Sequence, residues 1–341
     1  MTFFITLPFI CTIYLYHNAF GKRISYDNNY FEHMQKINPN LKRKRVNFPS
    51  NKGQLLKGYF YFSSKQAENK PKALVVFAHG MGVNHENYIA ELNHLVENNY
   101  LVFAYDNTGV NSSEGKKIKG LLQSPIDLKY TLDYISTIEQ AKDLPKFLLG
   151  HSWGGFAVTA VNNYKLKVKI DGIINLAGFE KNNVILKSRL KRDFNKLTVL
   201  LLPYIEVYQT LIFGKNTRIT GIRGLKKTDA KVLLIHSTDD NSVGFEDHFL
   251  KYHKAFKNDD RFKFITYVNA GHRLTINSKS VEKIKEIIDK QAGLDKTSLA
   301  YKKLNEERSE LINDFNYNIL NDITSFIESV ITDKENQDLN K

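Results

Sequence analysis

The sequence predicts an α/β fold built on a mostly parallel, doubly wound β-sheet. Short apolar runs, of the kind buried on both faces of such a sheet, alternate with amphipathic segments of helical period. This alternation of strands and helices is typical of parallel sheets with crossover helices. A chain of 341 residues, 42% of them hydrophobic, is long enough to bury one large core of this type.

The patterns also place the elements along the chain. A turn signal at 50–53 divides two β-rich runs and predicts a β-hairpin at 42–63. Later apolar runs predict strands at 74–78, 101–105, 147–149, 170–177, 231–235 and 264–268. Amphipathic patterns between them predict helices at 85–98, 124–140, 245–257 and 279–291.

One predicted strand ends in a motif that carries chemistry. The apolar run 147–149 leads into Gly-His-Ser-Trp-Gly at 150–154, and an Ala- and Val-rich segment follows. A sharp strand-to-helix turn of this kind lifts the serine hydroxyl above the strand end, where it can attack a carbonyl carbon. Glycines flank the serine because the turn leaves no room for side chains. Ser152 is therefore a candidate nucleophile.

A serine nucleophile needs a base, and the base needs an acid to orient it. The next-to-last predicted strand ends in a polar turn with Asp239 and Asp240, and the last one ends near His272. The order along the chain in folds of this type is serine, acid, histidine. We therefore predict a Ser-His-Asp triad of Ser152, His272 and one of the two aspartates.

These motifs give the chain a resemblance to the α/β-hydrolases of the serine aminopeptidase and lysophospholipase-like group. The resemblance also includes a His-Gly-Met-Gly motif at 79–82 and a turn at 106–115, and it covers about residues 40 to 290. It implies an α/β-hydrolase fold and two-step acyl transfer to water, with no metal or cofactor. In this family the acid lies four residues after a strand-end His and three before a Val, which selects Asp240.

The motif at 79–82 follows an apolar strand and predicts an oxyanion loop. We expect the backbone N–H of Met81 to join that of Trp153 in binding the developing oxyanion. His79 is a candidate substrate contact. Because His79 and His85 have no third ligand at a suitable spacing, no metal site is predicted.

Residues 180–229 interrupt the alternation of strands and helices and predict a helical cap over the serine. Its apolar residues, with Leu201 and Phe213 as candidate substrate contacts, either line an acyl pocket or pack on the core. The apolar cap favours an ester of an apolar acyl group. The alternative is a serine aminopeptidase, in which Glu180 or Glu206 holds the free amine. A hypothesis of another class is a catalytically inert, membrane-bound interaction module.

An apolar segment at 2–20 precedes the first charged residue, Lys22, and is just long enough to span a bilayer at ~20 residues. Three interpretations fit it: a membrane anchor, a cleaved signal peptide, or an apolar arm packed on the domain. Because it lacks a basic start and an Ala-x-Ala cleavage site, we favour a single-pass anchor. Basic residues follow the segment, so we expect the catalytic domain on the cytoplasmic side.

The net charge is +13, from 49 Lys and Arg against 36 Asp and Glu. Basic residues gather at 22–45, after the apolar segment, which favours contact with anionic lipid. No nucleic-acid-binding motif accompanies them, so nucleic acid is not an expected partner. The expected partner of the site is a small-molecule or lipid-like acyl substrate.

The expected organisation has three parts. An anchor at 1–21 precedes one hydrolase domain at 40–292, which contains the cap at 180–229. A C-terminal helical extension at 293–341 follows a break at Ala292-Gly293. The charged, amphipathic pattern of the extension predicts that it docks on the domain or on a partner.

Overall fold

The computed structural model describes residues 2–25, 30–67, 70–193 and 196–339. These residues form one eight-stranded sheet in the order β1-β2-β4-β3-β5-β6-β7-β8. β1 and β2 pair antiparallel, β2 pairs antiparallel with β4, and all later pairs are parallel. The predicted doubly wound sheet is thereby confirmed. The strands are β1 (Leu41–Pro49), β2 (Leu55–Ser63), β3 (Leu74–Ala78), β4 (Leu101–Tyr105), β5 (Lys146–His151), β6 (Gly172–Leu176), β7 (Lys231–Ser237) and β8 (Phe262–Tyr267).

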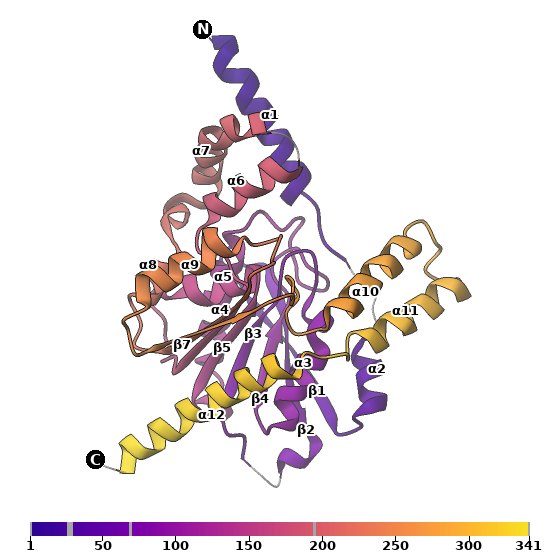
Figure 1. Cartoon of the computed structure of the whole chain (residues 1–341), viewed down its shortest axis with the longest axis vertical. Coiled ribbons are helices and arrows are strands. Elements are labelled where there is room, and N and C mark those ends of the chain that lie inside the picture. Colours follow the sequence, from indigo (N-terminus) through magenta and orange to yellow (C-terminus); the bar gives the residue numbers. More distant parts are fainter. Residues whose placement is uncertain (1, 26–29, 68–69, 194–195, 340–341) are drawn as a thin grey trace.

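Helices cover both faces of the sheet (Figure 1). α3 (Ile89–Glu97) and α12 (Tyr317–Leu339) pack on one face. α4 (Gln123–Ile135), α5 (Trp153–Ala160) and α9 (Phe245–Phe256) pack on the other. Each helix presents an apolar stripe to strands that are apolar on both sides, as expected for a sheet with two buried faces.

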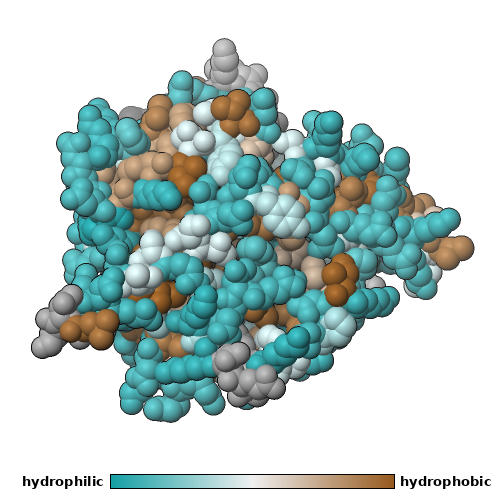
Figure 2. Space-filling model, turned by 60° about the horizontal axis from the view of Figure 1, so that its bottom comes forward, coloured by the Kyte–Doolittle hydropathy of each residue, from teal (hydrophilic) through white to brown (hydrophobic). Residues whose placement is uncertain are grey.

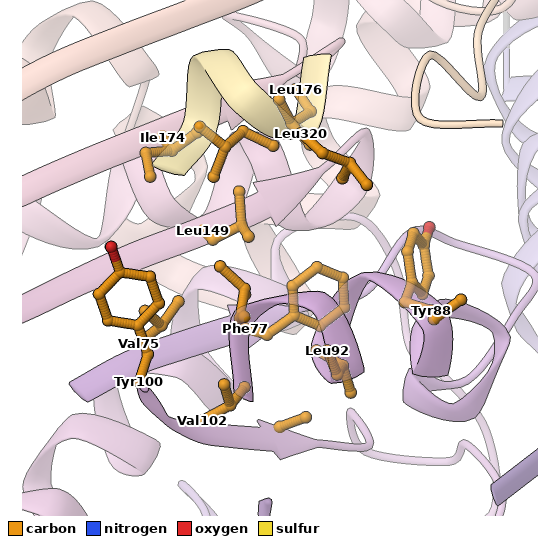
Figure 3. Packing of buried hydrophobic residues seen from close by; sticks show 14 of the residues in the cluster. Val75, Phe77, Tyr88, Leu92, Tyr100, Val102, Leu149, Ile174, Leu176 and Leu320 are labelled. Carbon is orange, nitrogen blue, oxygen red and sulfur yellow. The ribbon is translucent and has the colours of Figure 1, made fainter. Parts of the chain in front are cut away.

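The core under α12 shows how the far end of the chain completes the fold. In Figure 3, Leu320 of α12 lies over Ile174 and Leu176 of β6, while Phe77 and Leu149 continue the same apolar layer. Within this part of α12, Ile319 and Ile327 are fully buried as well. The segment predicted as a C-terminal extension thus supplies one layer of the hydrophobic core.

Three further helices stand beside this body. α2 (Tyr30–Ile37) packs against α3, and α10 (Ser278–Gln291) packs against α11 (Leu299–Leu311). The predicted single amphipathic tail after residue 297 is therefore two helices, α11 and α12, with a break at 312–316. In Figure 1 the α10–α11 hairpin projects to the right of the sheet, above α2.

Between β6 and β7 the chain leaves the sheet, in the interval expected to form the cap. It forms α6 (Asn182–Asp193), α7 (Leu202–Phe213) and α8 (Gly221–Leu225). α6 and α7 lie at the top of Figure 1, where α1 (Thr2–Phe20) runs alongside them.

The predicted single-pass membrane anchor is wrong. In the parts of the chain that the structure describes, no helix has both the length and the apolar character needed to cross a bilayer. α1 instead packs on the cap helices, where Tyr16 and Phe20 are buried and the Tyr16 ring lies edge-on to Tyr208 at 5.2 Å. This is the packed arm, the third of the interpretations that the sequence left open. The prediction that the catalytic domain lies on the cytoplasmic side of a membrane depended on this anchor and loses its basis.

Two arginines of the basic segment at 22–45 have partners within the chain. The guanidinium of Arg23 donates to the carbonyl of Gly115 at 2.7 Å. Arg43 forms an ion pair with Glu86 at 2.7 Å. These two cations therefore hold the segment after α1 and the first strand to the domain. Figure 2 shows a largely hydrophilic face with small, separate apolar patches, as expected for a chain with many lysines.

We predict that Ile319→Ala lowers the free energy of unfolding by about 2–5 kcal/mol, because it removes a fully buried side chain from the core under α12. Leu299→Ala is the matched control, since Leu299 is 80% exposed on α11. Chemical denaturation followed by circular dichroism measures both. Equal small losses in the two variants would show that α12 is not part of the cooperative core.

Candidate active site

Ser152 lies in a sharp turn between β5 and α5. Its backbone has φ 56° and ψ −110°, a region that non-glycine residues rarely adopt. The turn is crowded, because a Cβ on Gly154 would lie 1.9 Å from the carbonyl oxygen of Ala78 on β3. The N–H of Ser152 donates to the carbonyl of Leu176 at 2.8 Å and fixes the turn to β6. The predicted glycine requirement thus has a direct steric cause.

The structure brings the predicted nucleophile, base and acid together. Nε2 of His272 lies 2.9 Å from Oγ of Ser152, and Nδ1 of His272 lies 2.7 Å from Oδ2 of Asp240. Asp240 follows β7 and His272 follows β8, so all three side chains meet at the carboxyl ends of parallel strands. With a neutral imidazole, the serine hydroxyl donates to His272 and His272 donates to Asp240.

Asp240 is buried but well supplied with donors. Its Oδ1 accepts the backbone N–H groups of Ser242 at 2.8 Å and Val243 at 2.9 Å. Burial opposes ionisation, but the contacts with His236 and His272 and the backbone donors outweigh it and hold the pKa of Asp240 well below its usual range. The acid therefore carries its negative charge throughout the neutral range.

The neighbouring Asp239 does different work. It is exposed, and it accepts hydrogen bonds from the hydroxyl of Ser237 and, at 3.2 Å, from the N–H of Gly271. Its carboxylate thus ties the end of β7 to the loop that carries His272, whereas the imidazole of His272 contacts Asp240. The family's spacing from the strand-end His236 selects Asp240 over Asp239, and the hydrogen bonds in the structure agree, because Asp240 contacts His272.

A second hydrogen-bonded chain, which sequence reasoning missed, supports the site from below. The N–H of Gly80 donates to the hydroxyl of Tyr88 at 3.1 Å, and Tyr88 lies 2.8 Å from Nδ1 of His151. Nε2 of His151 lies 2.8 Å from the carbonyl oxygen of His272. Since a carbonyl can only accept, the proton of His151 is on Nε2, and Tyr88 donates to Nδ1. Tyr88 and His151 therefore link the 79–82 loop to the backbone of His272.

The electrostatics agree with this assignment. Burial, together with the nearby His272, holds the pKa of His151 well below its ordinary value, so the ring is neutral as the hydrogen-bonded chain requires. A buried His inside the Gly-x-Ser-x-Gly motif was visible in the sequence. Its partner Tyr88 lies 63 positions away, and no spacing rule points to it.

Of the two predicted oxyanion donors, Met81 borders the cavity that contains Ser152, and Trp153 follows Ser152 directly in the chain. Met81 lines this cavity together with Ser152 and His272. Trp153 is the first residue of α5, so its backbone N–H has no acceptor within the helix. The indole of Trp153 is turned away and donates to the carbonyl of Leu121 at 2.6 Å.

His79 lies behind this loop and is fully buried. Its Nε2 accepts the N–H of Asn107 at 3.1 Å, so its Nδ1–H donates to the carbonyl of Gly80 at 2.7 Å. Burial lowers the pKa of His79 and keeps the ring neutral. His79 is absent from the lining of the cavity beside Ser152, and its contacts hold the shape of the 79–82 loop.

The cavity beside Ser152 has a volume of about 340 Å³ and extends toward the α10–α11 hairpin and α2. Most of its lining is apolar, and every fully charged side chain in the lining is basic. The apolar residues are Met81, Val83, Ile276, Val281, Ile284, Ile288 and Ile312, and the basic ones are Arg273, Lys285 and Arg308.

A smaller cavity of about 230 Å³ lies between α1, α6 and α7 and shares Met81 with the first. Leu201 and Phe213, the substrate contacts expected in the cap, line neither cavity. Phe213 is buried in the apolar cluster under the cap, and Leu201 packs against that cluster. α6 and α7 line the smaller cavity through Leu186, Leu190 and Ile205 instead.

Within the described residues, no group of His, Cys, Asp and Glu side chains is arranged to hold a metal ion. His85 is occupied by its neighbours, because its Nδ1 lies 2.8 Å from Oδ1 of Asp106 and its Nε2 lies 2.9 Å from the hydroxyl of Tyr61.

Sequence comparison relates the chain to known hydrolases. A family model described as serine aminopeptidase, S33, matches residues 69–229. The monoglyceride lipase of Mus musculus is 30% identical over 147 residues, which are 42% of this chain and 48% of that protein. The human monoglyceride lipase is 34% identical over 86 residues, 25% of this chain and 28% of that protein. The matches thus span about half or less of these curated relatives.

Solved structures resemble the chain over more of its length. An esterase of Pyrococcus furiosus superposes with a TM-score of 0.54 at 17% identity, covering 80% of this chain and 96% of that one. Est1E of Butyrivibrio proteoclasticus, solved with ferulic acid bound, gives 0.52 at 19% identity, with 73% and 100% covered. An acylaminoacyl peptidase of Pyrococcus horikoshii gives 0.51 at 15%, with 81% and 46% covered. Esterases and a peptidase share this fold, so the fold alone does not choose between their substrates.

We predict that Tyr88→Phe lowers the free energy of unfolding by about 1–3 kcal/mol, because it leaves the buried N–H of Gly80 and Nδ1 of His151 without their shared partner. Tyr14→Phe is the control, since Tyr14 is 66% exposed on α1. Denaturation curves and steady-state kinetics with one ester give stability and kcat for both. Wild-type stability and kcat in Tyr88→Phe would contradict the linking role of this hydroxyl.

Proposed function

Because the chain belongs to the α/β-hydrolase superfamily and holds Ser152, His272 and Asp240 within hydrogen-bond distance, we propose that it is a serine hydrolase that cleaves carboxylic esters. The hydrogen-bonded series from Asp240 through His272 to Ser152 is the observation that carries this proposal. No metal or cofactor takes part in the proposed reaction.

The geometry supports a two-step acyl transfer. Nε2 of His272 removes the hydroxyl proton of Ser152 as Oγ attacks the ester carbonyl carbon. His272 then gives this proton to the departing alcohol, which leaves an acyl-Ser152 ester. In the second step His272 removes a proton from water as the water oxygen attacks the acyl carbon. His272 then gives this proton to Oγ of Ser152 as the bond to the acyl carbon breaks and the acid leaves. Asp240 keeps the imidazole oriented and stabilises its protonated form.

The negative charge on the carbonyl oxygen needs donors in both steps. We assign them to the backbone N–H groups of Met81 and Trp153, at the 79–82 loop and at the start of α5. The supporting observations are the place of Met81 in the cavity lining and the position of Trp153 at a helix N-terminus. His79 acts as a positioning residue through its hydrogen bond to the carbonyl of Gly80.

The cavity favours an apolar acyl ester as the substrate. Its apolar wall is formed by side chains from the 79–83 segment, the loop after β8, α10 and the residue that follows α11. The resemblance to monoglyceride lipases, whose name denotes the cleavage of acyl esters of glycerol, points in the same direction. The second cavity at Met81 offers additional apolar space under the cap and α1.

The alternative, a serine aminopeptidase, has the family description in its favour. That activity needs a carboxylate near the nucleophile to hold a free amine. The two candidates, Glu180 and Glu206, do not line the cavity beside Ser152, and the carboxylate of Glu206 accepts from Asn183 on the cap. The basic side chains that do line the cavity repel an ammonium group. The site therefore favours esters over peptides with a free amine. The inert, membrane-bound module has no support from the fold or the comparisons.

We predict that Ser152→Ala abolishes labelling by a fluorophosphonate probe and lowers ester hydrolysis by roughly 10⁴-fold or more, because the nucleophile is gone. Ser112→Ala, at an exposed serine in the 106–115 turn, is the control and should label as the wild type does. Gel fluorescence reports labelling, and circular dichroism reports the fold. Full hydrolysis by folded Ser152→Ala would sink the mechanism.

The two aspartates give a second test. Asp240→Asn should lower kcat by roughly 10⁴-fold, as loss of the orienting acid does in a triad, because His272 then loses its acceptor and its counter-charge. Asp239→Asn should cost far less, since its carboxylate holds only the loop. Steady-state kinetics on one ester ranks the two. The reverse ranking would transfer the role of the acid to Asp239.

A further inference from the structure

Arg308 is a buried cation on α11, in the wall of the cavity that contains Ser152. The residue is only 8% exposed to solvent. Nη1 donates to the side-chain oxygen of Gln291 at 3.0 Å, and Nη2 donates to that of Asn305 at 3.0 Å. Nε is buried and has no hydrogen-bond partner in the part of the chain that the structure describes.

These partners leave the charge of Arg308 uncompensated. Both acceptors are neutral amides, and no carboxylate among the described residues forms an ion pair with it. The ring of Tyr30, 5.3 Å from the guanidinium carbon, offers a cation–π contact, and because burial raises the pKa of Tyr30 its hydroxyl stays neutral and supplies no counter-charge. Removing a cation from water without a counter-charge is costly, so buried charges are normally paired. An anionic group brought to this place would supply the counter-charge that the described residues do not.

Other arginines of the fold show what a paired cation looks like here. Arg273, in the same cavity wall, forms an ion pair with Glu91 at 3.1 Å, and Arg43 forms one with Glu86 at 2.7 Å. Arg308 differs from both in having a buried nitrogen, Nε, without a hydrogen-bond partner among the described residues. Like Arg273, it also lines the cavity that contains Ser152.

We propose that the cavity binds an ester whose chain also carries an anionic group, a carboxylate or a phosphate, and that Arg308 receives this group. The inference rests on the proposed function, since the same cavity contains Ser152 and His272. The apolar wall suits the aliphatic part of such a molecule, and the anion supplies the charge that Arg308 lacks. Lys285, exposed on α10 and also in the lining, adds to the positive potential.

The proposal separates two parts of binding. The ester carbonyl lies at Ser152, and the anion acts away from the reacting atoms. Its contact with Arg308 is made equally in the substrate complex and in the transition state, so it lowers KM and leaves kcat nearly unchanged. Arg308 is therefore a specificity residue, and the acyl transfer itself is unaltered.

The experiment compares esters that differ in charge alone. The first pair is mono-nitrophenyl suberate, with a terminal carboxylate on the acyl chain, and nitrophenyl octanoate. The second pair is octanoyl glycerol phosphate, with a phosphate on the alcohol side, and octanoyl glycerol. We expect the wild type to prefer one anionic ester over its neutral counterpart by about tenfold to a hundredfold in kcat/KM, the range of one charge-assisted contact. Which pair shows the preference identifies the source of the anion.

Variants then assign the preference. Arg308→Gln should remove it through KM while the neutral ester is still cleaved, and Arg308→Lys should retain part of it. Lys285→Gln is the matched control at an exposed cation of the same wall and should keep most of the preference. Activity on the neutral esters reports that each variant is folded. If Arg308→Gln does not fold, the ratio of kcat/KM for the anionic and the neutral ester, measured in the wild type and in Arg308→Lys, still tests the role of Arg308.

The outcomes separate the two levels of the argument. Failure of every ester, with no fluorophosphonate labelling, overturns the proposed function. Cleavage of neutral esters with no preference for either anionic ester overturns the role of Arg308 alone. A preference for the anionic ester that persists in folded Arg308→Gln also overturns the role of Arg308. Loss of that preference in Lys285→Gln instead of Arg308→Gln does the same.

Discussion

The close approach of α5 to the ends of β3 and β5 is the constraint on which the site depends. Gly154 lies so near the carbonyl of Ala78 that a Cβ there would lie 1.9 Å from the oxygen. That contact fixes where α5 begins, and with it the strained backbone of Ser152 and the N–H of Trp153. His272 and Asp240 are held relative to this turn by the adjoining strands β7 and β8. The strand ends of the sheet thus determine where the site lies. The loops that follow these strands carry the side chains of the site.

The parts of the site that the sequence predicts are those with a local signal. Ser152, Asp240 and His272 each follow an apolar run by a few residues, and parallel strands bring their carboxyl ends to one edge. The strands and the hairpin were predictable for the same reason. Tyr88 and Arg308 have no such signal, because their importance comes from contacts with residues far away along the chain.

The errors also have a physical origin. Residues 2–20 are apolar, and an apolar helix can be buried either in a bilayer or against the surface of a protein. Hydropathy alone does not distinguish these two environments. The structure shows the second for the described part of α1, against Tyr208 and the cap. The wall of the main cavity was expected from the cap near Leu201 and Phe213. Instead, part of it comes from α10 and α11, whose amphipathic pattern predicts a buried face without saying what lies opposite.

The core layer supplied by α12 has a consequence for how the chain folds. Lys72 and Tyr100, beside the first parallel strands, contact Glu328 across sequence separations of 256 and 228 residues. Contacts this distant are slow to form, since a long loop must close before they contribute. Until α12 docks, the apolar part of this face over β6 and β7 is open to water, and such surfaces favour association between chains. The order of elements along this chain therefore leaves the covering of that apolar surface to its last helix.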